Sequence, residues 1–195
     1  MTDTSRQDLG LLALRVGVGA TLFAHGAQKL FGWFGGGGIE GTAGGMQAMG
    51  FHPPRRNAVM AGLGEAGGGA LLALGLATPV GGAAAASTML AAGAVHRPAG
   101  FFAMQGGFEY TGVLGLAGAA LAVGGPGRYS LDRLLGDRLN SPWLAVTALT
   151  LLGSASGYVV TRRQKTLAAA PGTSDDQPGE GMQAEATGGT GTPDA

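Results

Sequence analysis

The stretch LLALRVGVGATLFAHGAQKLFGWF, residues 11–34, decides the fold class of this chain. It is long and apolar enough to cross a bilayer, which takes about 20 residues of helix. It also carries Arg15, His25 and Lys29, and charged or titratable side chains are costly where they face hydrocarbon. If the stretch is a membrane span, these side chains must therefore face polar partners in other segments of the protein.

The composition supports a membrane protein. Of the 195 residues, 45% are hydrophobic and 12% are charged, whereas about 25% are charged in a typical soluble domain. The formal net charge is +0, so the charge balance gives no reason to expect nucleic acid as a partner. Most of the 40 glycines lie inside apolar runs, where small residues let membrane helices approach closely. The chain has no cysteine, so any thiol chemistry must belong to a partner.

The sequence predicts transmembrane helices at residues 9–34, 58–77, 79–96, 108–124 and 142–160. The predicted fold class is an all-α integral membrane protein, in which a four-helix transmembrane bundle is followed by a fifth, C-terminal transmembrane helix. The second and third helices meet at Thr78 and Pro79, which predicts a tight antiparallel hairpin. Pro79 suits the first turn of the new helix, because the N–H that proline lacks would have no partner there.

The domain boundaries follow from these spans. We predict an N-terminal tail at residues 1–8, the four-helix membrane bundle at 9–136, the extra transmembrane helix at 142–161 and a disordered polar tail at 162–195. The mixed charges of Asp3, Arg6 and Asp8 are unlike a cleaved signal peptide, so we expect the first segment to be retained. The distribution of Lys and Arg leans toward a cytoplasmic C-terminus in a multi-pass protein of the cell membrane.

Two connections are long enough to contain structure of their own. The glycine-rich segment at residues 35–57 is predicted to be a flexible loop with a short interfacial turn. After the fourth span, Ser130 is predicted to cap a helix over residues 131–139. Its leucines recur at helical spacing with charged residues opposite, so we expect an amphipathic helix at the membrane surface.

The polar residues of the predicted spans gather at one end of the bundle. At about 100° per residue, His25 and Lys29 lie within roughly 80° of Arg15, so they share one face of the first helix. Tracing each helix across the membrane places one set of side chains in the half opposite the N-terminus, namely His25, Lys29, Glu65, His96 and Glu109. Arg15 lies in the other half, where the returning loop carries Asp132, its predicted partner in a structural ion pair.

Ionisable side chains within membrane spans are functional candidates by default. Glu65 and His25 are the predicted catalytic residues, because a buried carboxyl group beside an imidazole can relay a proton near neutral pH. Lys29, His96 and Glu109 are the predicted cofactor-binding residues. The structural alternative is that Lys29 and Glu65 form a buried ion pair that only fixes helix packing, while side chains near helix ends reach out to water.

Two further patterns do not predict a site. GLGEAG, residues 62–67, matches the G-x-G-x-x-G dinucleotide fingerprint, which requires a preceding strand, but here it lies inside an apolar helix. Gly64 and Gly68 instead predict a face for close helix packing. No metal site is predicted, because bundle di-iron sites use a Glu-x-x-His spacing that no span contains.

Several motifs resemble the DoxX family of small bacterial membrane proteins. They are LRVGVGATLFAHGAQKLFG in the first span, AGLGEAGGGALLALGLATPVG across the hairpin, AVHRPAGFF, FEYTGVL and GPGRYSLD. The resemblance covers residues 9–135 and leaves out the fifth span. It implies a four-helix core in the cytoplasmic membrane. The family is named for its resemblance to a subunit of a thiosulfate:quinone oxidoreductase, and some members are linked with superoxide dismutase and a sulfurtransferase.

The sequence leaves more than one function open. The first hypothesis is a membrane subunit of a redox complex, with a quinone as cofactor at the intramembrane polar residues. The second is a non-catalytic scaffold that recruits soluble redox or thiol-stress enzymes through residues 35–57 or 131–139. A small transporter is the third. The expected partners are the lipid bilayer, soluble redox enzymes and further copies of the chain, with no nucleic acid.

Overall fold

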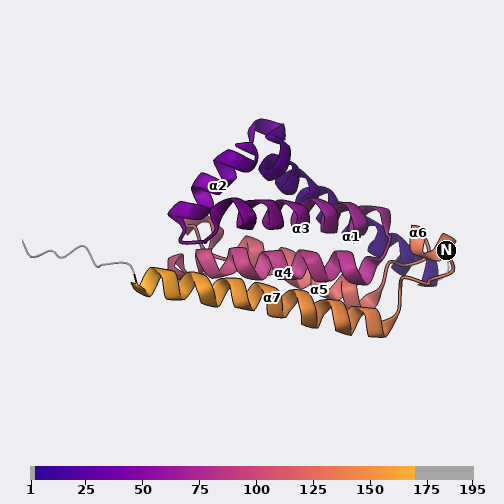
Figure 1. Cartoon of the computed structure of the whole chain (residues 1–195). Coiled ribbons are helices and arrows are strands. Elements are labelled where there is room, and N and C mark those ends of the chain that lie inside the picture. The colour runs from indigo at the N-terminus through magenta and orange to yellow at the C-terminus, as the bar shows by residue number, and fades with distance from the viewer. Residues whose placement is uncertain (1–2, 170–195) are drawn as a thin grey trace, which may run out of the picture.

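The computed structural model describes residues 3–169, and every regular element in that range is a helix, which confirms the all-α prediction (Figure 1). The α-helices are α1 (Asp3–Phe31), α2 (Gly38–Ala48), α3 (Pro54–Leu74), α4 (Thr78–His96), α5 (Glu109–Gly124), α6 (Leu131–Leu134) and α7 (Pro142–Ala169). Short 3-10 turns at Trp33–Gly35, Arg97–Ala99 and Ala103–Gln105 lie in the connections.

Within residues 3–169, three helices are long and apolar enough to span a bilayer: α1, α4 together with the turn that follows it, and α7. α5 is apolar but shorter, at 16 residues. α3 has 21 residues, but it is not in this set, because glycines and polar side chains dilute its apolar content. The long helices therefore account for only part of the five predicted spans.

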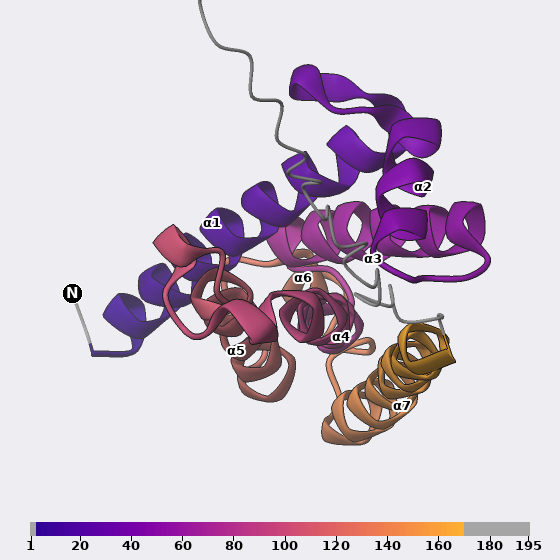
Figure 2. The ribbon, with the colours of Figure 1, turned by 90° about the vertical axis from the view of Figure 1, so that its left-hand side faces the viewer.

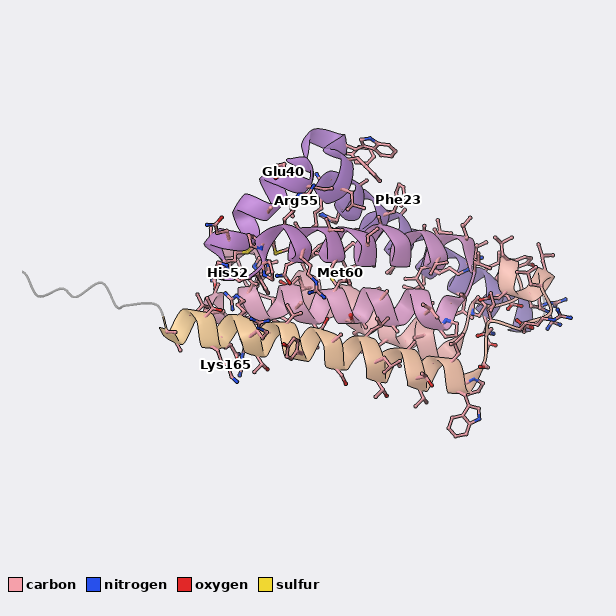
Figure 3. All side chains as sticks on the ribbon, in the orientation of Figure 1. Phe23, Glu40, His52, Arg55, Met60 and Lys165 are labelled. Atoms are coloured by element: carbon pink, nitrogen blue, oxygen red, sulfur yellow. The ribbon has the colours of Figure 1, made fainter. Side chains whose placement is uncertain are left out.

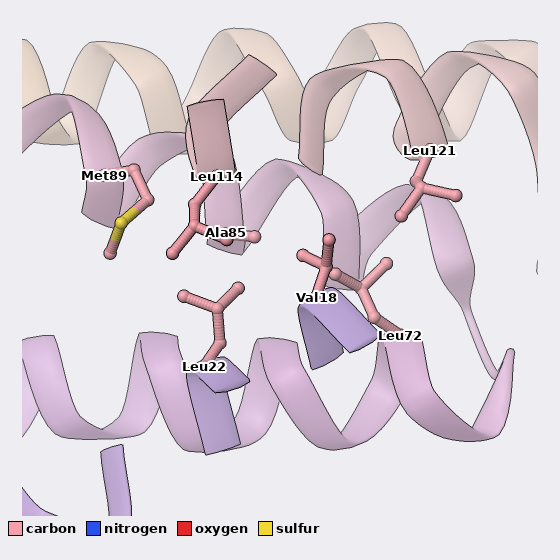
Figure 4. Close-up of a cluster of buried hydrophobic side chains, with 7 residues drawn as sticks. All are labelled: Val18, Leu22, Leu72, Ala85, Met89, Leu114 and Leu121. Atoms are coloured by element: carbon pink, nitrogen blue, oxygen red, sulfur yellow. The ribbon is translucent and has the colours of Figure 1, made fainter. Parts of the chain in front are cut away.

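α3 and α4 form the antiparallel hairpin that the sequence predicted, and the other helices pack around it. α1 packs along α3, whereas α4 contacts α3, α5 and α7. In the end-on view of Figure 2, α4 lies between α5 and α7. Pro79 lies in the first turn of α4, as expected. A buried cluster joins α1, α3, α4 and α5 at the centre (Figure 4); its members are Val18, Leu22, Leu72, Ala85, Met89, Leu114 and Leu121.

Glycines bring the helix backbones together. A Cβ atom at Gly19 of α1 would lie 2.5 Å from the carbonyl oxygen of Gly69 in α3, closer than real side chains allow. On the opposite side of α3, a Cβ atom at Gly64 would lie 2.4 Å from Thr88 of α4, and one at Gly68 would lie 3.0 Å from Ala84. The predicted packing face of Gly64 and Gly68 is confirmed, and α3 fits between its neighbours only because these positions lack side chains.

The glycine-rich connection after α1 is more ordered than the sequence predicted. Residues 38–48 form the helix α2 rather than a flexible loop. α2 packs against both α1 and α3. Figure 3 shows Glu40 of α2 and Arg55 of α3 on neighbouring segments, and their side chains form an exposed ion pair at 3.0 Å. Packing therefore stabilises a helix that its glycine content disfavours.

The predicted amphipathic helix at residues 131–139 is wrong, although Ser130 does cap a helix: its Oγ accepts a hydrogen bond from the N–H of Arg133. α6 ends at Leu134, and Asp137 has a positive φ of 57°. Leu134 is 81% exposed, whereas Asp132 is completely buried. The helix is thus shorter than predicted, its leucines are exposed, and the Asp132 carboxylate turns inward because it binds the start of α4.

Two helices extend beyond their predicted bounds. α1 begins at Asp3, within the predicted N-terminal tail, and ends at Phe31. α7 continues to Ala169, so residues 162–169 of the predicted polar tail are helical. The rest of that predicted tail lies outside the described residues.

Candidate functional site

The polar side chains of the bundle form two groups at opposite ends. One group, here called the far-end cluster, consists of His25, Lys29, Glu65 and Tyr110 and draws on α1, α3 and α5. The other consists of Arg15 and Asp132 and lies beside the α3–α4 turn. The first holds the predicted catalytic pair, and the second holds the predicted structural pair.

Lys29 and Glu65 are brought together by the close packing of α1 and α3. The Nζ atom of Lys29 lies 2.6 Å from Oε2 of Glu65. Glu65 is only 4% exposed, whereas the Lys29 side chain keeps 26% of its surface accessible. Lys29 also points its ammonium group at the carbonyl oxygen of His25, at 3.5 Å. A buried carboxylate is thus held by a cation that reaches the outside of the bundle.

His25 meets a partner that the sequence did not predict. Its Nε2 atom lies 3.0 Å from the hydroxyl oxygen of Tyr110, and the two rings meet edge to face with centroids 5.9 Å apart. Tyr110 is in the first turn of α5 and is 45% exposed. Lys29 contacts both Glu65 and the carbonyl oxygen of His25, so the two pairs adjoin. The only signal in the sequence was a tyrosine beside Glu109, at the end of the bundle where the other groups were expected.

His96 and Glu109, the other predicted cofactor-binding residues, bind the connection between α4 and α5. The Nδ1–H of His96 donates to the carbonyl oxygen of Gly106 at 2.9 Å. Oε2 of Glu109 accepts from the N–H of Ala103 at 3.0 Å. Within residues 3–169 neither side chain forms an ion pair. The structure therefore gives them contacts that shape a loop, and places Tyr110 rather than Glu109 at His25.

Arg15 is buried against the end of α3. Its guanidinium donates to the carbonyl oxygens of Leu72, at 3.3 Å, and Ala73, at 2.6 Å. It also donates to the carbonyl oxygen of Tyr129, in the segment before α6. The last carbonyls of a helix lack partners within the helix and carry partial negative charge, so a cation is favourable there. Arg15 thus joins α1, α3 and the segment after α5.

Asp132 binds the beginning of α4. Its Oδ1 accepts from the N–H of Ala77 at 2.7 Å, and its Oδ2 accepts from the N–H of Thr78 at 2.9 Å. The predicted direct ion pair with Arg15 does not form among the described residues. Both ionic groups bind backbone instead, since the ends of a tight hairpin offer several unpaired amides and carbonyls.

A shallow groove, open over most of its extent, lies on the outer face of α1 beside Leu114 of α5. Its volume is about 460 Å³, and its lining residues are Ala13, Leu14, Gly17, Val18, Thr21 and Leu114. Residues one helical turn apart are neighbours on a helix surface. Thr21 is one turn from His25, and Leu114 is one turn from Tyr110, so the groove leads to the His25–Tyr110 pair.

The described residues contain no group of three or more His, Asp or Glu side chains that could hold a metal ion. Glu65 has a lysine as its ion-pair partner, and His25 has a tyrosine as its hydrogen-bond partner. What the far-end cluster offers instead is hydrogen-bond donors and exchangeable protons next to an apolar surface.

The DoxX family profile matches residues 10–98, from α1 to the turn after α4. The match includes Arg15, His25, Lys29 and Glu65, but not Tyr110 or Asp132. It is shorter than the resemblance over residues 9–135 expected from the motifs. No curated protein and no solved structure matches the chain. Residues 10–98 thus match the DoxX family, and together with the long apolar helices this match suggests a multi-pass membrane protein.

Proposed function

We propose that the chain is the membrane subunit of a quinone-linked redox complex in the cell membrane, and that the far-end cluster binds the quinone headgroup and moves its protons. The observation that carries this proposal is the buried carboxylate of Glu65, 2.6 Å from Lys29 and adjoining the partly exposed His25–Tyr110 pair. Ionisable groups within a membrane bundle are energetically costly and rare. A buried carboxylate at this position is therefore a functional-site candidate.

The proposal assumes a topology of five spans, with α3 and α5 crossing the membrane beside α1, α4 and α7. α3 is less apolar than its neighbours, but it lies between α1 and α4, which cover both of its glycine faces. At 1.5 Å per residue, its 21 residues extend about 32 Å, enough to cross the hydrocarbon core. The shorter α5 extends about 24 Å, so we expect the bilayer to be locally thinner beside it.

When bound, the quinone supplies the acceptor for two electrons and two protons. The electrons come from a soluble partner that oxidises a sulfur compound, such as two thiols that form a disulfide and release two electrons and two protons. That partner must carry the sulfur chemistry, because the chain has no cysteine. The chain's own residues bind the headgroup and exchange its protons: the His25–Tyr110 pair donates the hydrogen bond that it has free, and Glu65, which Lys29 holds in place, is the carboxyl group that takes up and releases protons.

The test is the quinone-linked activity of Glu65→Gln in membranes, which removes the exchangeable proton and keeps the shape of the side chain. We expect activity to be lost while the amount of inserted protein stays near that of the wild type. Glu109→Gln is the matched control and should remain active, because among the described residues this carboxylate accepts its hydrogen bond from the loop backbone at Ala103. Full activity of Glu65→Gln overturns the proton-transfer role.

A second candidate function is a scaffold for soluble redox enzymes, and a specific observation favours it. The connections at the far end of the bundle carry exposed apolar side chains, including Trp33, Phe34, Phe102 and Met104. Replacing Phe34 and Phe102 with serine should release bound enzymes from membranes without affecting the far-end cluster. Retention of every partner by this variant counts against a scaffold at that surface. The segment at residues 131–139 no longer supports it, because the helix there is short.

A further inference from the structure

We propose that the groove between α1 and α5 holds the apolar chain of a lipid-soluble quinone, and that the His25–Tyr110 pair at its end hydrogen-bonds the headgroup. The redox role of that quinone rests on the proposed function, whereas the site, the orientation of the ligand and its route from the lipid are new. Three features support this site: the shape of the groove, the unused hydrogen-bond donor of the His25–Tyr110 pair, and the neutralised charge of the Lys29–Glu65 ion pair.

The groove suits a single apolar chain. Its lining is apolar apart from Thr21, and the hydroxyl of Thr21 already donates to the carbonyl oxygen of Gly17 at 2.8 Å. A Cβ atom at Gly17 would have no neighbour within 4 Å, so this part of the groove is open. From Leu14 to His25 the helix rises roughly 16 Å, which is the length of an extended chain of about a dozen carbons. The groove is open on the outside of the bundle, where we expect lipid to lie.

The polar end of the groove keeps one hydrogen-bond donor available. Nε2 of His25 and the hydroxyl of Tyr110 share one hydrogen bond at 3.0 Å. If the imidazole donates, the tyrosine hydroxyl proton is unused; if the tyrosine donates, the proton of the histidine is on Nδ1 instead. Either arrangement leaves the pair with one unused donor, on Tyr110 or on Nδ1 of His25. A quinone carbonyl oxygen is an acceptor without a proton, and it matches that donor.

The charge behind the pair favours a neutral headgroup. Lys29 is the cation on the same face of α1, and it is neutralised by Glu65 at 2.6 Å. The headgroup of a phospholipid carries a phosphate, which binds best to unpaired arginine or lysine side chains. A quinone carbonyl requires a donor but no counter-charge. The far-end cluster therefore fits a neutral carbonyl compound better than an anionic lipid.

The experiment measures equilibrium binding of decyl-ubiquinone to the purified full-length chain in lipid nanodiscs. Gly17→Leu adds a side chain in the groove at a position where a Cβ atom has no neighbour within 4 Å, and we expect it to weaken binding by at least about tenfold. Gly153→Leu is the matched control, since a Cβ atom at this glycine of α7 also has no neighbour within 4 Å. Tyr110→Phe removes a hydroxyl and should weaken binding by roughly three- to tenfold.

The outcomes separate this inference from the proposed function. Wild-type-like binding by Gly17→Leu, no binding by the wild type, or displacement of decyl-ubiquinone by phosphatidylglycerol would each overturn the quinone groove. The last result would make the groove a phospholipid site. Glu65→Gln addresses the other claim: if it binds decyl-ubiquinone and retains redox activity, the proton-transfer role fails while the groove assignment stands. Loss of activity with retained binding supports both.

Discussion

Arg15 and Asp132 stabilise the same hairpin from opposite sides of its turn without forming an ion pair. Arg15 donates to the carbonyl oxygens of Leu72 and Ala73 at the end of α3, and Asp132 accepts from the amides of Ala77 and Thr78 at the start of α4. Each charge has the sign that complements the helix end it binds. The arrangement also requires Gly75, where φ is 63° and a Cβ atom would lie 2.8 Å from the Arg15 guanidinium.

Asp132→Asn should therefore destabilise the folded protein strongly. The substitution places an amide N–H₂ group against backbone donors and leaves Arg15 without its nearby negative charge, for a loss of about 2–3 kcal/mol. Thermal unfolding in detergent measures this as a lower melting temperature. The control is Asp137→Asn in the same segment, which breaks only the exposed pair with Arg133 at 2.8 Å and should cost less than about 0.5 kcal/mol. Equal melting temperatures for the two variants would contradict this role.

Two variants separate the contribution of the Lys29–Glu65 pair to stability from its contribution to activity. Lys29→Met leaves a buried carboxylate unpaired and should lower the free energy of unfolding by about 2 kcal/mol. Adding Glu65→Gln should recover most of that loss, because the buried carboxylate that lacks a cation is then replaced by an uncharged group of similar shape. Quinone-linked activity should stay low in the double variant. If activity returns together with stability, the pair is only a structural lock.

Glycine packing in α3 predicts a contrast between neighbouring positions. A Cβ atom at Gly69 would lie 2.5 Å from the backbone of α1, so Gly69→Ala should separate the helices and cost about 1–3 kcal/mol. Gly67, in the same helix, faces outward with nothing within 4 Å of a Cβ atom. Gly67→Ala should be neutral or raise stability by up to about 1 kcal/mol. A lower melting temperature for Gly67→Ala than for Gly69→Ala would show that α1 and α3 do not pack as described.

The C-terminal part of α7 is predicted to hold the connection between α2 and α3. Nε of Arg163 donates to the carbonyl oxygen of Met49 at 2.8 Å, and its guanidinium lies 5.4 Å from the centroid of the Phe51 ring. Arg163→Ala should increase amide hydrogen exchange around Met49 and Phe51, with a change in overall stability near 1 kcal/mol. Arg162→Ala, which removes only a contact with Tyr158, is the control. Unchanged exchange in both variants would argue against this role of α7.

Much of the fold could be predicted from the sequence, because the signals for it are local. The Thr78–Pro79 junction predicted the hairpin, Ser130 predicted a helix start, and glycine spacing predicted the packing face at Gly64 and Gly68. The helix α2 was missed, because its glycines disfavour an isolated helix and only contacts with α1 and α3 stabilise it.

The site was harder to predict, because its contacts join residues that are distant in the chain. The position of each residue along its predicted helix gave its depth in the membrane, and similar depths were enough to pair Lys29 with Glu65. It could not find the His25–Tyr110 hydrogen bond, which depends on how α1 and α5 are rotated about their axes. Nor could it show that Asp132 binds the backbone of the hairpin, since that contact joins residues that are 54 and 55 positions apart in the chain.

The most direct test of the quinone site is mass spectrometry of the small molecules that the full-length protein retains after gentle purification from its own membrane. The account predicts that the wild type and Gly153→Leu carry a lipid-soluble quinone, and that Gly17→Leu and Tyr110→Phe carry much less of it. A stable wild-type protein that retains no quinone, or a quinone content that is the same in all four proteins, would contradict the account.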